Sequence, residues 1–311
     1  MTEPNLNFVD CPDASGGHRM AYWQWGDARA AHVIVCAHGL SRQGRDFDVL
    51  AQALVARAAG AVRIVCPDVV GRGKSDWLKD PVGYQIPSYA ADMLALLAAP
   101  DFVKPVTLDW VGTSMGGLIG MVICGQPGLP LPVPVRRLVL NDVGPTIQWQ
   151  ALQRIGQYLG NAPRFASLEQ AAQAMWVIST GFGPHTPAQW LALSTAMVKP
   201  MDDSQGGVAL HYDPAIAVPF RAVTQESAAQ GEAALWQIYD GSVGFVASRR
   251  AGISRPSSQR ARYRSLSSNS ATLSAWLAST WRRMRWPSSS THPAGSRKLR
   301  TISVGGDASA V

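Results

Sequence analysis

Short apolar runs alternate with amphipathic segments along the first half of the chain. Four runs rich in valine, isoleucine and leucine predict buried strands at residues 31–37, 62–66, 106–111 and 135–140. Between them, residues 47–59 and 88–99 place apolar side chains at helical spacing, and Pro87 with Ser88 forms a typical helix start. Strands that alternate with helices predict an α/β fold, in which helices cover both faces of a mostly parallel sheet.

The third predicted strand leads into Gly112-Thr113-Ser114-Met115-Gly116, which has the pattern G-x-S-x-G, and a small apolar helix follows it. A serine on a sharp strand-to-helix turn needs small neighbours, because the backbone there is strained and closely packed. The turn exposes the hydroxyl, and the helix N-terminus supplies N–H groups and a positive dipole for an oxyanion. Ser114 is therefore predicted to be a catalytic nucleophile.

Two other segments follow predicted strands and are therefore expected at the same edge of the sheet as Ser114. His38-Gly39-Leu40 follows the first strand, and Asp142 follows the fourth. Parallel sheets bind ligands at the carboxyl ends of their strands, so these residues are expected near the nucleophile. The backbone amides of Leu40 and Met115 are the expected oxyanion donors. His38 and Gly39 are expected to support the loop rather than to transfer protons.

Residues 20–241 resemble the α/β-hydrolase fold, close to the branch that contains esterases and meta-cleavage-product C–C hydrolases. The matching segments are residues 38–40, 67–68 with 71–76, 112–117 and 140–145. The resemblance implies a hydrolase with Ser114 as nucleophile and the amides of Leu40 and Met115 as the oxyanion hole. It also implies a hydrolase core at residues 1–145, a helical cap at 146–235 and a return to the core at 236–241.

Within the expected cap, residues 148–159, 167–178 and 186–198 are predicted helices, because prolines stand near their starts and glycines interrupt them. Large apolar side chains in this region either line the substrate pocket or form the ordinary core of the cap. They are Met175, Trp176, Phe182, Trp190 and Met197.

The last 70 residues differ in composition from the rest of the chain. Residues 1–241 contain 16 Lys and Arg against 20 Asp and Glu, a net charge of −4, whereas residues 242–311 contain 12 against one, a net charge of +11. This Ser/Arg-rich tail therefore accounts for the overall formal charge of +7. It shows no alternating strand of useful length and no Gly-His pair. The resemblance requires an acid and a histidine after the cap, so the C-terminal strands are expected to be missing or disrupted.

A reading-frame shift near Gly241 and Ser242 would explain this composition. Residues 249–258, back-translated with codons of our choice and read one base later, can give Gly-Ala-Pro-Glu-Ser-Arg-Asp-Leu-Leu. That peptide resembles the segment that carries the acid in the family. Read literally, residues 242–311 are predicted to be a disordered tail. In that case Asp142 is either the acid or a structural loop residue, and His292 is the candidate base.

The sequence implies no cofactor and no metal. Gly73-Lys74-Ser75 lacks the earlier glycine of a phosphate loop, because Asp68 stands at that position. The four cysteines, at positions 11, 36, 66 and 124, have no metal-ligand spacing. They are interpreted as reduced thiols of a cytoplasmic protein, since the chain shows no signal-peptide run and no apolar segment of transmembrane length.

We therefore expect a serine hydrolase that cleaves a carboxylic ester or a related acyl bond of a small molecule through a Ser114 acyl-enzyme. Activity of the chain as written is expected to be impaired. One alternative is a non-catalytic protein of the same fold. Another is an interaction protein whose basic tail binds nucleic acid, but charge alone is weak support and no nucleic-acid partner is expected.

Overall fold

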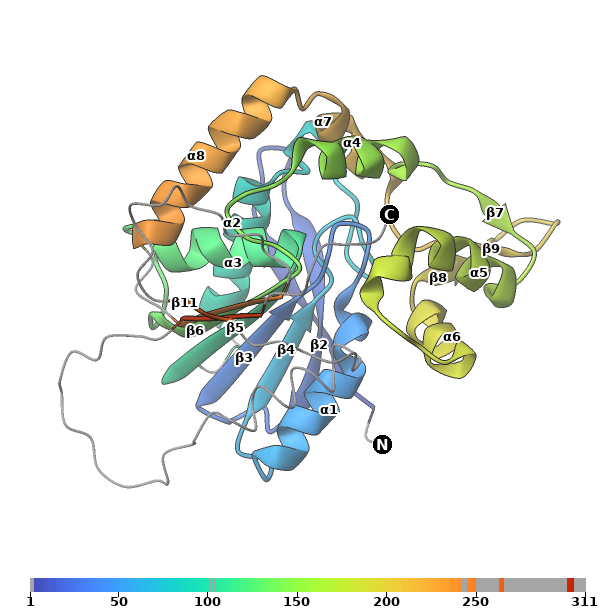
Figure 1. Cartoon of the computed structure of the whole chain (residues 1–311). Helices are drawn as coiled ribbons and strands as arrows, with labels where there is room; N and C mark the ends of the chain where they lie inside the picture. The colour runs from blue at the N-terminus through green and yellow to red at the C-terminus, as the bar shows by residue number, and fades with distance from the viewer. Residues whose placement is uncertain are drawn as a thin grey trace, which may run out of the picture.

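A nine-stranded sheet in the order β1-β2-β4-β3-β5-β6-β10-β12-β11 forms the centre of the molecule (Figure 1). The computed structural model describes residues 3–100, 102, 104–241, 245–249, 263–265 and 301–304. The pairs β1–β2 and β2–β4 are antiparallel, and the other neighbouring pairs are parallel. The first six strands are β1 (Asn5–Cys11), β2 (His18–Gly26), β3 (His32–Ala37), β4 (Arg63–Pro67), β5 (Thr107–Thr113) and β6 (Val135–Asn141).

The four predicted strands correspond to β3, β4, β5 and β6, and the two predicted helices correspond to α1 (Asp48–Arg57) and α2 (Ile86–Ala98). These strands are continuous apolar runs because helices cover both faces of the sheet. Ile34 of β3 packs into the core that α1 shares, whereas Val33 and Val35 belong to the core on the face of α2 and α3 (Met115–Gly125). Figure 1 shows α1 on one side of the sheet and α2 with α3 on the other.

The three helices predicted for the cap correspond to α4 (Trp149–Tyr158), α5 (Leu168–Ser179) and α6 (Pro187–Thr195). The sequence pattern does not reveal the three-stranded antiparallel sheet beside them, whose order is β7-β9-β8. Its strands β7 (Arg164–Phe165), β8 (Val198–Pro200) and β9 (Val208–Leu210) are too short to show an alternation. In Figure 1 this small sheet lies with α5 and α6 to one side of the main sheet.

A short helix, α7 (Ala217–Arg221), precedes α8 (Gln225–Gly241), which runs unbroken across the predicted boundary between cap and core at residues 235–236. Leu235, Trp236 and Ile238 of α8 pack against the main core, and Tyr239 is buried in it. The last turns of α8 therefore return to the core, where the helix lies against α3.

Three short strands extend the sheet beyond β6. They are β10 (Phe245–Arg249), which pairs with β6, then β12 (Thr301–Val304) and β11 (Tyr263–Ser265). The predicted α/β-hydrolase architecture is confirmed, and strands of five, four and three residues agree with the expected disruption at the C-terminus. The sequence pattern does not locate these strands, and most of residues 242–311 lie outside the described part of the chain. Among the residues described, no helix is long and apolar enough to cross a membrane.

Candidate active site

Ser114 occupies the turn between β5 and α3, and its backbone is strained. Its φ of 48° lies in the left-handed region, which residues other than glycine rarely adopt. The amide of Ser114 donates to the carbonyl of Asn141 (2.9 Å), and the carbonyl of Ser114 accepts from the amides of Gly117 and Leu118 (2.8 and 3.1 Å). These bonds hold the turn from both sides, so the serine has the conformation that a nucleophile elbow requires.

Two glycines allow the helix to dock directly on the loop that follows β3. A side chain at Gly116 would collide with the carbonyl of Ala37, and one at Gly112 would collide with the carbonyl of Gly116. The amide of Gly116 donates instead to the carbonyl of His38 at 3.0 Å. The small residues of the G-x-S-x-G pattern are therefore explained by backbone contacts of this turn.

The two predicted oxyanion donors lie on either side of this junction. Met115 is the first residue of α3, so its amide has no acceptor within the helix. Leu40 follows Gly39, and a methyl group added at Gly39 would lie 3.8 Å from Cβ of Ser114. The loop that carries Leu40 thus runs beside the serine, while the role of both amides remains a prediction.

Arg72 connects the loop that carries Leu40 with the start of α3. Its Nε donates to the carbonyl of Leu40 (2.8 Å), and its Nη2 lies 3.7 Å from Sδ of Met115. Its Nη1 donates to the carbonyl of Val70 (2.6 Å) and to the hydroxyl of Tyr89 (3.1 Å). The side chain is fully buried, and the ion pairs of the described residues include none to it. The sequence motif contains Arg72, but only the fold reveals this positioning role.

His38 is buried and bonded to the backbone through both ring nitrogens. Nδ1 lies 2.7 Å from the carbonyl of Gly39, and Nε2 accepts from the amide of Val69 at 2.9 Å. Burial lowers the pKa of His38 to about 3, and the nearby guanidinium of Arg72 acts in the same direction. The ring is therefore neutral and engaged on both sides, which agrees with the supporting role expected for His38 and Gly39.

Asp142 follows β6 directly, with a φ of 57° and an exposed side chain. The register pairs Thr113 with Asn141, so Ser114 and Asp142 directly follow the paired last residues of the neighbouring strands β5 and β6. This placement keeps Asp142 as a candidate acid without assigning it that role. His292, the candidate base, lies outside the described residues.

Each of the other described histidines contacts another side chain or a backbone group. His18 contacts Asp13 and Asp92, His32 contacts Asp109, and Nδ1 of His185 lies 2.9 Å from the carbonyl of Gly183. His211 lies at the exit from the cap, where burial lowers its pKa to about 4. Within the described part of the chain, no histidine is hydrogen-bonded to the hydroxyl of Ser114.

Most of the large apolar residues of the cap form the cap's own core. This core contains Met175, Trp190 and Met197, with Trp176 packed against them. Phe182 is 40% exposed, and its ring lies 6.1 Å from the ring of Trp190 and 5.6 Å from Cζ of Arg42. Arg42 lies beside Gly39, so Phe182 connects the cap core with the loop beside the serine.

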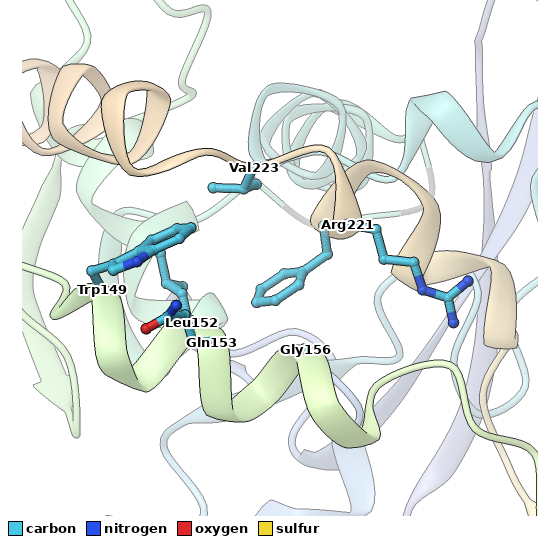
Figure 2. Close-up of a pocket in the computed structure, with 7 residues that line it drawn as sticks. Trp149, Leu152, Gln153, Gly156, Arg221 and Val223 are labelled. Carbon is cyan, nitrogen blue, oxygen red and sulfur yellow. The ribbon is translucent and has the colours of Figure 1, made fainter.

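A cavity of about 150 Å³ lies between α4 and the segment that contains α7. Figure 2 shows Trp149, Leu152 and Gln153 on α4 facing Val223 across it, while the guanidinium of Arg221 extends away. None of the predicted site residues lines this cavity. Its volume is below the several hundred Å³ typical of ligand sites, so we do not assign the substrate to it.

The sheet, the strained serine and the loop beside it together define an α/β hydrolase. Residues 32–172 match the alpha/beta hydrolase fold family. A protein of Cupriavidus necator, described as a 3-hydroxybutyrate-oligomer hydrolase, is 50% identical over 244 residues, which make up 78% of this chain and 80% of that protein. The chain belongs to the alpha/beta hydrolase superfamily, as an esterase-like enzyme.

Solved structures support the same fold. A putative hydrolase from Rickettsia typhi superposes with a TM-score of 0.67 at 21% identity, covering 98% of this chain and 91% of that chain. An alpha/beta hydrolase from Novosphingobium aromaticivorans superposes with a TM-score of 0.64 at 26% identity, with the same two coverages.

Proposed function

We propose that this protein hydrolyses linear esters of short 3-hydroxy acids by nucleophilic catalysis at Ser114. The conformation of Ser114 is the observation that carries the proposal, because a strained serine at a helix N-terminus serves acyl transfer. The substrate class follows from the relative that is described as a 3-hydroxybutyrate-oligomer hydrolase. Each link in such an oligomer is a carboxylic ester, so ordinary acyl chemistry is sufficient.

In the proposed reaction, Oγ of Ser114 attacks the ester carbonyl carbon while a base removes its proton. The amides of Leu40 and Met115 receive the negative charge that develops on the carbonyl oxygen. The alcohol end of the ester leaves with a proton, and water then hydrolyses the acyl-enzyme. Arg72 positions both donor segments without contacting the substrate.

The described residues supply no histidine for the base. We propose that the base and its acid are encoded in another reading frame from about Gly241 onward, so that the chain as written is impaired. The abrupt change of net charge at residue 242 supports this interpretation. Residues 242–311 make up 70 of the 311 residues, and the alignment with the Cupriavidus necator relative covers 78% of the chain. The part of the chain that this alignment leaves uncovered is therefore similar in size to the tail.

Steady-state hydrolysis of a 3-hydroxybutyrate dimer tests the proposal on two proteins. One is the chain as written, and the other is read one base later after the Gly241 codon. We expect the second protein to be active and Ser114→Ala to lower its kcat by about 10³-fold or more. Ser204→Ala, a change on an exposed loop, serves as the matched control and should leave kcat unchanged. Full activity in the Ser114→Ala variant would contradict the proposal, and the non-catalytic alternative predicts no hydrolysis by either protein.

A cytoplasmic location is part of the same proposal. All four cysteines are free, and three of them are buried. Free thiols that are retained in a folded core suit a reducing compartment.

A further inference from the structure

A second cluster of reactive side chains lies where the hairpin of β1 and β2 meets α2. Cys11 ends β1, His18 begins β2, and Asp92 lies in α2. Sγ of Cys11, one ring nitrogen of His18 and one carboxylate oxygen of Asp92 all lie within 4.8 Å of one another. Cys11 and Asp92 are buried, and the side chain of His18 is only 6% exposed. Two strands, β4 and β3, separate this cluster from β5 and the candidate active site.

The imidazole of His18 is oriented as in a metal site. Nε2 lies 3.1 Å from Oδ2 of Asp92, and Nδ1 lies 2.9 Å from Oδ2 of Asp13. Asp13 is itself fixed, because its Oδ1 accepts from the amides of Ser15 and Gly17 (2.7 and 2.9 Å). A histidine that binds a metal through one nitrogen usually donates its other N–H to such a carboxylate.

The donor set of the cluster suits a divalent cation. Asp92 supplies a carboxylate oxygen, His18 a ring nitrogen and Cys11 a sulfur, and all three side chains are shielded from solvent. A cation that binds there displaces the thiol proton of Cys11, because the thiolate is the form of cysteine that binds metals.

We propose that Cys11, His18 and Asp92 bind one Zn²⁺ ion, with Asp13 as the residue that orients His18. One sulfur, one imidazole nitrogen and one carboxylate oxygen form a donor set that zinc prefers, and water completes a tetrahedral site. Binding requires that Sγ of Cys11 and Nε2 of His18 carry no proton, so the thiol proton and any proton on Nε2 pass to solvent. The ion ties the edge hairpin to α2, the helix in which Tyr89 contacts Arg72. This site does not depend on the proposed ester hydrolysis.

Cysteine spacing could not indicate this site, because each ligand comes from a different segment of the chain. Only the pairing of β1 with β2 and the packing of α2 against β1 bring them together.

Titration of the full chain with Co²⁺, after treatment with a chelator, tests the proposal. We expect one Co²⁺ per chain, a thiolate-to-cobalt charge-transfer absorption, and displacement of Co²⁺ by Zn²⁺. Cys11→Ala should abolish the absorption. Cys124→Ala should retain it, because Cys124 lies in α3 away from the cluster. Calorimetry in two buffers of different ionisation enthalpy should show that binding releases protons, because the Cys11 thiol must lose its proton to bind the metal.

Asp13→Asn keeps all three ligands and is expected to weaken Co²⁺ affinity by about 10–100-fold. Asp13 lies in the loop between β1 and β2 with its side chain 23% exposed, so this variant keeps the test decisive even where Cys11→Ala fails to fold. Absence of the charge-transfer absorption in the unmodified chain up to pH 8.5 would overturn the proposal. An unchanged absorption in folded Cys11→Ala, or an unchanged affinity in Asp13→Asn, would also overturn it.

Discussion

Arg72 joins the two segments that flank Ser114 through one buried guanidinium. Its three nitrogens reach three different acceptors and a thioether, a fork geometry that lysine cannot reproduce. We predict that Arg72→Lys lowers the free energy of unfolding by about 2–4 kcal/mol, because buried carbonyls lose their donors. In the frame-restored enzyme, kcat should fall by about tenfold or more while KM changes little, since the oxyanion donors are displaced.

Urea unfolding and ester kinetics measure both effects. Arg19→Lys is the matched control, because the side chain of Arg19 is 58% exposed, and it should shift stability by less than about 0.5 kcal/mol. Equal effects of the two substitutions would refute a positioning role for Arg72.

The pairing of His18 predicts a dependence of stability on pH. The pKa of His18 is about 9 in the folded chain and near 6.5 in the unfolded chain. The stabilisation is therefore complete below pH 6.5 and is lost as the pH rises through 9. We expect the free energy of unfolding to fall by an amount on the order of 1–3 kcal/mol over this range.

Urea unfolding at several pH values in the presence of a chelator measures this change without a contribution from bound metal. Between pH 6.5 and 8 the thiol of Cys11 stays protonated in the folded chain, where its pKa is raised, and cysteines of the unfolded chain ionise mainly above this range. His18→Gln should therefore remove the slope between pH 6.5 and 8, whereas ionisation of cysteines in the unfolded chain contributes at higher pH. A slope that persists in the variant would show that another group is responsible.

Local sequence predicts some site residues and not others. Ser114 and its small neighbours could be found because five consecutive residues define the turn. The contacts of Arg72 with Leu40 and Met115, and the contact of His18 with Asp92, could not be found, because these partners lie 32 to 74 positions apart in the chain. Long-range packing determines those contacts, and no spacing rule records it.

At the scale of elements, two glycines in helices give opposite predictions. Gly116 of α3 packs against the carbonyl of Ala37, so we expect Gly116→Ala to destabilise the protein by about 3 kcal/mol. Gly231 of α8 has no atom within 4 Å of an added Cβ. Gly231→Ala should therefore stabilise the protein by about 0.5–1 kcal/mol, since alanine is the better helix former. Thermal or urea unfolding measures both, and a neutral Gly116→Ala would contradict the described docking of α3.

Long, buried elements could be predicted from the sequence pattern, whereas short or partly exposed elements could not. The strands β3 to β6 are mostly buried and the cap helices carry clear start and stop signals, so their bounds could be predicted within a few residues. The strands β7 to β12 contain two to five residues each, and they exist only through pairing with neighbours. The continuous helix α8 also escapes prediction, because its first part is exposed and its last part packs on the core.

At the scale of the whole molecule, the change of composition at residue 242 is the main feature to explain. The reading-frame proposal predicts an extra or missing base between the codons for Leu235 and Ser258. DNA sequencing across this region, with the intact mass of the expressed chain, measures this directly. An unchanged frame with a mass that matches all 311 residues would refute the proposal and leave a hydrolase fold with a basic tail.

The central claim is that Ser114 is an activated nucleophile, and mapping a fluorophosphonate adduct by tandem mass spectrometry tests it most directly. In the frame-restored protein we predict a stoichiometric adduct on Ser114, and much slower labelling in the chain as written. A folded, frame-restored protein that remains unlabelled, or that carries the adduct on another residue, would contradict the account.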